Sequence, residues 1–170
     1  MRVGFGYDSH RFDDDSRAVQ KLGGVAIEGC PKLKAHSDGD VLLHALTDAL
    51  LGAAALGDIG GRFPDSDPRW RGADSAEMLA EVVRELAAHG WRAANVDATV
   101  ICERPKIAPH AAAIRARIAA LLGVAAGAVS VKGKTNEKMD DVGAGLGIEV
   151  HCVTLVERAS AMEIMEGEKR

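Results

Sequence analysis

The sequence predicts an α/β fold, an α+β sandwich in which helices cover one face of a mixed sheet. Two observations support this fold class. Strand-like and helix-like segments alternate along the chain, as is typical of layered domains. The length of 170 residues suits one domain with a sizeable core. Since no repeat or linker divides it, we expect a single domain over residues 1–157 and a charged C-terminal tail over residues 158–170.

The first part of the chain predicts a strand, a hairpin and a long helix. Residues 2–8 alternate between apolar and small or polar types, which indicates a strand. A short hairpin follows at residues 25–27, and then a loop over residues 29–39. The triplet His36-Ser37-Asp38 offers N-cap chemistry for a helix over residues 39–56.

The second part predicts two more helices and three more strands. Residues 58–67 are rich in Gly, Asp and Pro, which is typical of a functional loop. Residues 75–89 repeat apolar side chains at helical spacing. The other expected elements are strands over residues 95–102, 129–132 and 148–156, and a helix over residues 109–122 with Pro109 in its first turn.

Composition excludes several classes of protein. The formal net charge of −4 predicts no broad basic face for nucleic acid. Cys30, Cys102 and Cys152 are widely spaced and form no C-x-x-C pattern, so neither a disulfide framework nor a thiolate zinc site is indicated. No segment resembles a secretory leader or a membrane span. We therefore expect a cytoplasmic protein with no membrane partner.

The end of the first strand holds a pair of candidate metal ligands. In Asp8-Ser9-His10, the first and third side chains point to the same face of a strand, while Ser9 points away. A carboxylate and an imidazole are common zinc ligands. The alternative is a polar strand end whose groups are hydrogen-bonded to each other.

The long helix adds a polar stripe to an otherwise apolar segment. Asp40, His44 and Asp48 are spaced i, i+4, i+8 and so share one helix face. Buried ionisable groups need partners, and a zinc ion bound by Asp8, His10 and His44 would supply one while leaving a fourth position open. Asp40 or Asp48 would then orient the imidazole. The alternative is a core histidine paired with an aspartate.

A later segment suits phosphate oxygens and a hard cation. Residues 132–138 combine lysines with small and hydroxyl residues, and Glu137 offers a carboxylate for Mg²⁺. A solvated charged loop is the alternative. Gly143-x-Gly145-x-Gly147 follows, but it precedes a strand rather than a helix, so a tight turn is a better interpretation than a dinucleotide site.

Several segments, in order along the chain, resemble the 2-C-methyl-D-erythritol 2,4-cyclodiphosphate synthase family. The longest is His36-Ser37-Asp38-Gly39-Asp40-Val41-Leu42-Leu43-His44-Ala45-Leu46-Thr47-Asp48-Ala49-Leu50-Leu51-Gly52, which is similar to the family signature almost letter for letter. The others are Gly6-Tyr7-Asp8-Ser9-His10-Arg11-Phe12, Gly57-Asp58-Ile59-Gly60, Phe63-Pro64-Asp65-Ser66-Asp67, Arg104-Pro105-Lys106 with Pro109-His110, and Thr135-Asn136-Glu137-Lys138. The resemblance extends to about residue 157.

The resemblance implies a reaction and an assembly. The substrate would be 4-diphosphocytidyl-2-C-methyl-D-erythritol 2-phosphate, whose 2-phosphate attacks the β-phosphorus of its own diphosphate and releases CMP. The cofactors would be Zn²⁺ and either Mg²⁺ or Mn²⁺. The assembly would be a homotrimer, with the sheets facing the central axis and an active site between adjacent subunits.

The resemblance also implies roles for individual residues. Asp8, His10 and His44 would bind zinc, and Glu137 the second cation. His36 and Thr135 would be catalytic, through stabilisation of the transition state, and Ser37 would contact phosphate. The full implied substrate site is Asp8, Ser9, His10, His36, Ser37, Asp58, Ile59, Gly60, Phe63, Pro64, Asp65, Ser66, Asp67, Cys102, Glu103, Arg104, Pro105, Lys106, Ile107, Ala108, Lys134, Thr135, Asn136 and Glu137. Within that set, residues 102–108 would form the cytidine pocket from the neighbouring subunit.

The chain departs from the family pattern after the Glu-Lys pair. Asp141 stands where the family commonly has an aromatic residue, and Ala144 where it has an arginine. In the family these positions line a central trimer cavity that can bind prenyl diphosphates. Since Ala144 offers no bidentate anchor for phosphate, the sequence gives no support for such binding. Two rival functions are a zinc phosphohydrolase, which would release inorganic phosphate, and a non-catalytic nucleotide-binding trimer.

Overall fold

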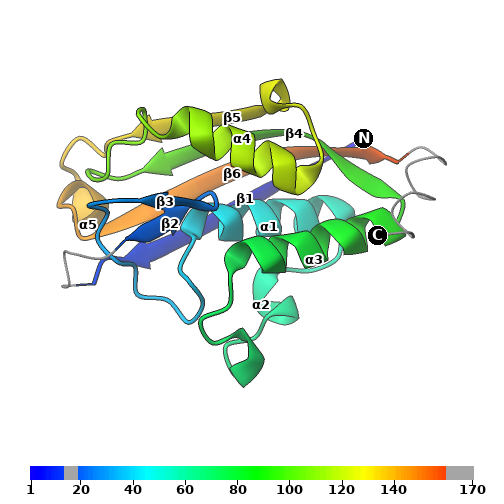
Figure 1. Ribbon diagram of the computed structural model, residues 1–170, viewed down its shortest axis with the longest axis horizontal. Coiled ribbons are helices and arrows are strands. Elements are labelled where there is room, and N and C mark those ends of the chain that lie inside the picture. Colours follow the sequence, from blue (N-terminus) through cyan, green and yellow to red (C-terminus); the bar gives the residue numbers. More distant parts are fainter. Residues whose placement is uncertain (14–18, 160–170) are drawn as a thin grey trace.

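A computed structural model describes residues 1–13 and 19–159 of the chain (Figure 1). Its main sheet has four strands in the order β1-β6-β4-β5: β1 (Arg2–Arg11), β6 (Gly147–Arg158), β4 (Trp91–Ile101) and β5 (Val129–Lys134). β6 is antiparallel to both β1 and β4, and β4 is parallel to β5. β1, β4 and β5 therefore run in one direction, so their C-terminal ends lie at the same end of the sheet.

Three helices cover one face of this sheet, and the predicted mixed α/β fold is confirmed (Figure 1). α1 (Val41–Ala54) packs on β1 and β6, α3 (Ser75–Ala88) lies beside α1, and α4 (Ala111–Leu122) packs on β5. The smaller elements are a hairpin of β2 (Gln20–Leu22) and β3 (Val25–Ile27), the short helices α2 (Ile59–Arg62) and α5 (Asp140–Gly143), and 3₁₀ turns at Pro68–Trp70 and Ala126–Ala128. None of the described helices is long and apolar enough to cross a membrane.

α1 lies directly on β1 because two glycines of the strand face the helix. A Cβ atom on Gly6 would lie 1.9 Å from the carbonyl oxygen of Ala45, and one on Gly4 would lie 1.9 Å from that of Ala49. Real Cβ atoms never approach backbone oxygen so closely, so only glycine permits this separation. The helix is buried on most sides, since every residue of α1 except Asp48 and Gly52 is buried.

The N-terminus of α1 differs from the prediction. The helix begins at Val41, and its cap is Asp40 rather than the predicted triplet at residues 36–38. The fully buried Asp40 carboxylate accepts the backbone N–H groups of Leu43 at 3.1 Å, Gly23 at 2.8 Å and Gly24 at 2.7 Å. Burial raises the pKa of Asp40, and these hydrogen bonds oppose that rise. Asp40 thus joins the β2–β3 turn to the start of α1.

Other boundaries also shift from their predicted positions. β1 continues beyond residue 8 to Arg11, because it pairs with β6 along its whole length. The predicted loop at residues 58–67 contains α2, which Asp58 caps by accepting from the N–H of Gly61. α4 begins at Ala111, so the predicted start at Pro109 is wrong. α5 was not predicted, since four residues are too few for a periodic pattern.

The remaining predictions have mixed outcomes. The hairpin, the helix at residues 75–89 and the later strands are confirmed within a few residues. The three cysteines are free and buried, which agrees with the absence of a disulfide framework. Residues 160–170, most of the predicted tail, lie outside the described part of the chain. The domain boundary at residue 157 therefore stays a prediction.

The face of the sheet opposite the helices carries exposed apolar side chains. Val3, Phe5 and Tyr7 of β1 are 68%, 61% and 43% exposed, and Val153 of β6 is 41% exposed. Phe5 and Val153 are directly paired across the two strands, so these side chains share one surface. Such a contiguous apolar face is typical of an interface with another protein chain.

The close packing of α1 on β1 generates a prediction about stability. Gly6→Ala should lower the free energy of unfolding by about 3 kcal/mol, because the new methyl group forces the helix backbone away from the strand. Gly52→Ala is the matched control: its Cβ would have an ordinary contact of 4.0 Å with the carbonyl oxygen of Phe5, so it should not destabilise the protein. Urea denaturation with chelator present measures both. Equal stability of the two variants would contradict this account of the packing.

Candidate active site

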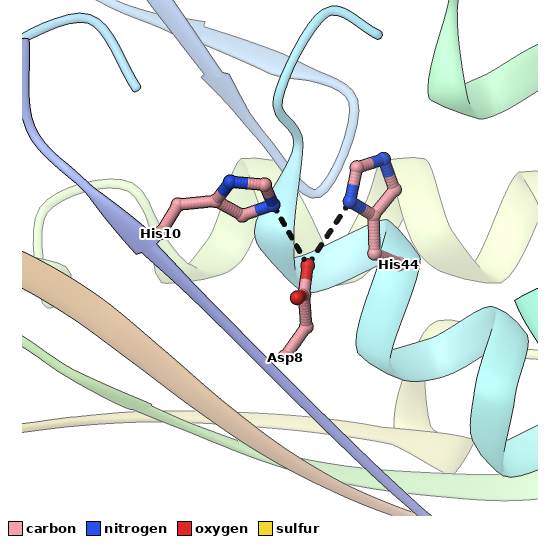
Figure 2. A group of neighbouring side chains, drawn as sticks. All are labelled: Asp8, His10 and His44. Carbon is pink, nitrogen blue, oxygen red and sulfur yellow. Dashed lines mark hydrogen bonds and ion pairs between the residues drawn. The ribbon is translucent and has the colours of Figure 1, made fainter. Parts of the chain in front are cut away.

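Asp8, His10 and His44 converge at the C-terminal end of β1 (Figure 2). The Asp8 Oδ2 atom lies 3.0 Å from His10 Nε2 and 3.0 Å from His44 Nδ1. Each residue offers one possible metal-ligand atom, and these three atoms all lie within 4.8 Å of one another. Among the described residues, this is the group of three His, Cys, Asp or Glu side chains that is close enough to share a metal ion. One carboxylate and two imidazoles match the donors that bind zinc, and three protein ligands leave a coordination position for substrate or water. The three residues therefore fit a divalent metal ion.

Local structure explains why these three side chains meet. Asp8 and His10 are two residues apart on β1 and point to its helix face, whereas His44 is in the first turn of α1. Burial tends to raise the pKa of Asp8, but hydrogen bonds from His10 and His44 outweigh it and lower that pKa to about 2. Burial tends to lower the pKa of His10, but the Asp8 carboxylate raises it above its ordinary value. Asp8 therefore stays an anionic ligand at neutral pH.

The other nitrogen of each histidine also has a partner. His10 Nδ1 lies 2.8 Å from the backbone oxygen of Lys34. His44 Nε2 lies 2.9 Å from Ser75 Oγ and 3.0 Å from Ser37 Oγ. The prediction that Asp40 or Asp48 orients His44 is therefore wrong. Asp40 accepts from backbone N–H groups only, and Asp48 Oδ1 accepts the N–H of Ile59 at 2.7 Å.

A cavity of about 560 Å³ opens beside the three ligands. It brings together many predicted site residues: Asp8, His10, His36, Ser37, His44, Ile59, Gly60, Phe63 and Asp65. Its lining also includes Lys34, Asp48, Trp70 and Met78, of which only Asp48 was considered from the sequence, as a partner for His44. Lys34 and Trp70 lie in or next to loops that no periodic pattern covers, so only their types, a cation and a large aromatic ring, hinted at a role. Ser9, Asp58, Pro64, Ser66 and Asp67 do not line this cavity.

A second, smaller cavity of about 130 Å³ lies at the ends of β4 and β5. Its lining includes the predicted residues Cys102, Pro105, Lys106, Ile107, Ala108 and Lys134, together with Gly133. Glu103 and Arg104 do not line it. Burial raises the pKa of Cys102 to about 11, which keeps this thiol neutral.

The loop after β5 holds the predicted residues Thr135, Asn136 and Glu137. The Glu137 carboxylate is exposed and accepts a hydrogen bond of 2.8 Å from the Thr135 hydroxyl. Glu137, Lys138 and Asp140 have positive φ angles of 49°, 63° and 55°. Left-handed backbone at non-glycine residues is strained and clusters at functional sites. The sequence did not predict this strain, because non-glycine residues normally adopt negative φ angles.

Most of the predicted site residues thus fall into two groups in one chain. The first lies at the end of β1, and the second at the ends of β4 and β5. β1 and β5 are the opposite edges of the four-stranded sheet, and no residue lines both cavities. The single chain therefore does not bring Glu137 or Lys106 to the three candidate metal ligands.

The comparisons with known proteins agree over nearly the whole chain. The model of the YgbB family matches residues 1–157. The 2-C-methyl-D-erythritol 2,4-cyclodiphosphate synthase of Alcanivorax borkumensis is 55% identical over 157 residues, which are 92% of this chain and 97% of that protein. The corresponding protein of Dechloromonas aromatica is 54% identical over 158 residues, which are 93% of this chain and 98% of that protein.

Solved structures are similar as well. A 2C-methyl-D-erythritol-2,4-cyclodiphosphate synthase in its CDP-bound form has a TM-score of 0.83 and 38% identity, over 92% of this chain and all of that one. The bifunctional IspDF from Campylobacter jejuni has a TM-score of 0.87 and 37% identity over 92% of this chain. The match covers only 42% of the bifunctional protein. The family model and the close relatives together show that this chain belongs to the YgbB family, whose members from Alcanivorax borkumensis and Dechloromonas aromatica are named 2-C-methyl-D-erythritol 2,4-cyclodiphosphate synthases.

Proposed function

We propose that this chain converts 4-diphosphocytidyl-2-C-methyl-D-erythritol 2-phosphate into 2-C-methyl-D-erythritol 2,4-cyclodiphosphate and CMP. It is thus a phosphorus–oxygen lyase of the methylerythritol phosphate route to isoprenoids. The observation that carries the proposal is the triad of Asp8, His10 and His44 beside an open cavity. The names of the close relatives support the same reaction.

Zn²⁺ is the proposed ion at the triad, and Mg²⁺ or Mn²⁺ the proposed ion at Glu137. Two imidazoles and a carboxylate suit zinc, whereas a single exposed carboxylate suits a hard cation that takes its other ligands from phosphates and water. When bound, such cations offset the repulsion between the reacting phosphates and the charge on the leaving CMP.

The protein residues have a positioning task in this reaction. The attacking phosphate is already an anion and is tethered to its target, so proximity supplies much of the rate enhancement. His36 and Ser37 line the cavity beside the triad, where they would contact phosphate oxygens, and Lys34 adds a cation to the same wall. Thr135 would contact the diphosphate from the second group. No described side chain needs to act as a nucleophile.

The complete site is proposed to form between subunits of a homotrimer. The triad and the proposed cytidine pocket lie at the same end of the sheet but at opposite edges, so a ring of copies would bring one group of each chain to the other group of its neighbour. The apolar face formed by Val3, Phe5, Tyr7 and Val153 would be buried at the centre of that ring. CDP-bound relatives support a cytidine diphosphate ligand.

The first prediction tests the reaction. Purified protein should produce CMP and the cyclic diphosphate from the substrate, and a chelator should stop both products. His44→Ala should reduce turnover by about 100-fold or more and remove zinc, because it deletes a ligand. His89→Ala, at the exposed C-terminal end of α3, should leave both unchanged. Release of inorganic phosphate without CMP would instead identify a phosphohydrolase.

The second prediction concerns the cation at Glu137. Glu137→Gln should leave zinc in place but lower turnover at fixed Mg²⁺, with partial rescue at higher Mg²⁺ or Mn²⁺. Glutamine has the same backbone cost at positive φ, so a difference in turnover between Glu137→Gln and the unchanged protein reports the lost charge. Asp141→Asn is the control, a nearby exposed carboxylate. The measurement is a metal titration at saturating substrate; superimposed curves for Glu137→Gln and the unchanged protein would refute this role.

The third prediction tests the divided site. His44→Ala and Thr135→Ala should each be nearly inactive alone, but a coexpressed mixture should regain about one quarter of the unchanged activity, since random assembly gives that share of intact sites. Light scattering should report a mass of about three times 17.8 kDa. An inactive mixture of well-folded trimers would mean that each chain holds its own complete site.

A further inference from the structure

We propose that Ser75 is a positioning residue, which accepts the Nε2–H of His44 and thereby directs His44 Nδ1 towards the bound metal. The proposal rests on the metal site of the proposed function. It assigns a role to a residue that is far from the triad in sequence and does not line the cavity.

Ser75 is the first residue of α3 and is buried, with 1% of its surface exposed. Its hydroxyl oxygen lies 2.9 Å from His44 Nε2. The same hydroxyl donates a hydrogen bond to Oδ1 of Asp38. The buried Ser75 hydroxyl therefore bridges the ring of a proposed metal ligand to the half-buried carboxylate of Asp38.

The available hydrogens determine the direction of the two bonds that Ser75 makes, to His44 and to Asp38. A serine hydroxyl has one hydrogen to donate, and an ionised carboxylate can only accept. The Ser75 hydrogen is therefore donated to Asp38, which leaves the oxygen lone pairs for His44. The Nε2 atom of His44 must then carry a hydrogen, so Nδ1, which faces Asp8 at 3.0 Å, is the ring nitrogen left to bind a metal.

Charges behind Asp38 support this direction. The Lys21 ammonium lies 3.3 Å from Oδ2 of Asp38 and 2.8 Å from Oδ2 of Asp74. The backbone N–H of Asp40 also donates to Oδ1 of Asp38, at 3.2 Å. Asp38 thus faces an ammonium and a backbone N–H group, as expected for a carboxylate that accepts the Ser75 hydrogen.

Ser37 is a weaker partner for the same nitrogen. Its hydroxyl lies 3.0 Å from His44 Nε2, and its oxygen also accepts a hydrogen bond of 3.3 Å from the N–H of Gly39. Within residues 1–13 and 19–159, no carboxylate accepts the Ser37 hydrogen, so Ser37 does not select one tautomer of the ring. Metal-bound histidines commonly donate their second N–H to an acceptor that orients them, as His10 does with the Lys34 carbonyl.

The experiment measures Zn²⁺ affinity and the His44 imino proton. Zn²⁺ alone is titrated against a competing chelator, and the Nε2–H exchange rate is measured by NMR on Zn²⁺-loaded, ¹⁵N-histidine-labelled protein. Ser75→Ala should weaken Zn²⁺ binding by about 10- to 100-fold and make the proton exchange fast. Ser37→Ala should have a smaller effect on both. Thr154→Val, which also removes a buried hydroxyl, should match the unchanged protein.

Asp38→Asn provides a second variant if Ser75→Ala does not fold. An amide can donate to Ser75 and turn its hydroxyl hydrogen towards His44, so Zn²⁺ affinity should fall by about tenfold. The proposal is overturned if folded Ser75→Ala and Asp38→Asn proteins both keep the Zn²⁺ affinity of the unchanged protein within about twofold. It is also overturned if Ser37→Ala is the only variant in which the His44 Nε2–H exchanges fast. Protein that binds Zn²⁺ normally but forms no cyclic product would overturn the proposed function and leave the role of Ser75 intact.

Discussion

The direct contact between α1 and β1 is the constraint on which the candidate site depends. Gly4 and Gly6 let the helix backbone approach the strand so closely that no side chain separates them. Two residues further along the same strand face, Asp8 takes the place of glycine, and there the strand meets the first turn of the helix at His44. A wider separation would take His44 out of reach of Asp8, because a histidine side chain cannot extend to compensate.

The ionisable groups of this region are buried or half-buried, and their hydrogen-bonding partners explain why that burial is tolerated. Asp40 is fully buried and accepts three backbone N–H groups. His44 has partners on both ring nitrogens, and Lys21 approaches the carboxylate that receives the Ser75 hydrogen. Buried polar groups are costly only when they lack such partners. The same bonds that stabilise the fold therefore also orient His44, a proposed metal ligand.

The sheet topology separates the two groups of site residues that the proposed reaction needs to combine. The metal triad lies at one edge strand and the proposed cytidine pocket at the other, although parallel strand directions bring both to the same end of the sheet. A cyclisation depends mainly on holding one flexible substrate in a reactive shape. A site divided between neighbouring subunits can hold that substrate at two distant points, one at the phosphates and one at the base.

The sequence by itself determined the fold class, most helices and strands, and the triad, since period-two and period-3.6 patterns report which side chains share a face. Asp8 and His10 followed from strand alternation, and His44 from its place on an apolar helix. Only the tertiary structure decided the cap at Asp40, the partnership of Ser75 with His44, and the separation of Glu137 from the triad. These features join residues that are distant along the chain or depend on backbone angles in loops. Local sequence patterns do not predict such contacts, because packing between helices, strands and loops creates them.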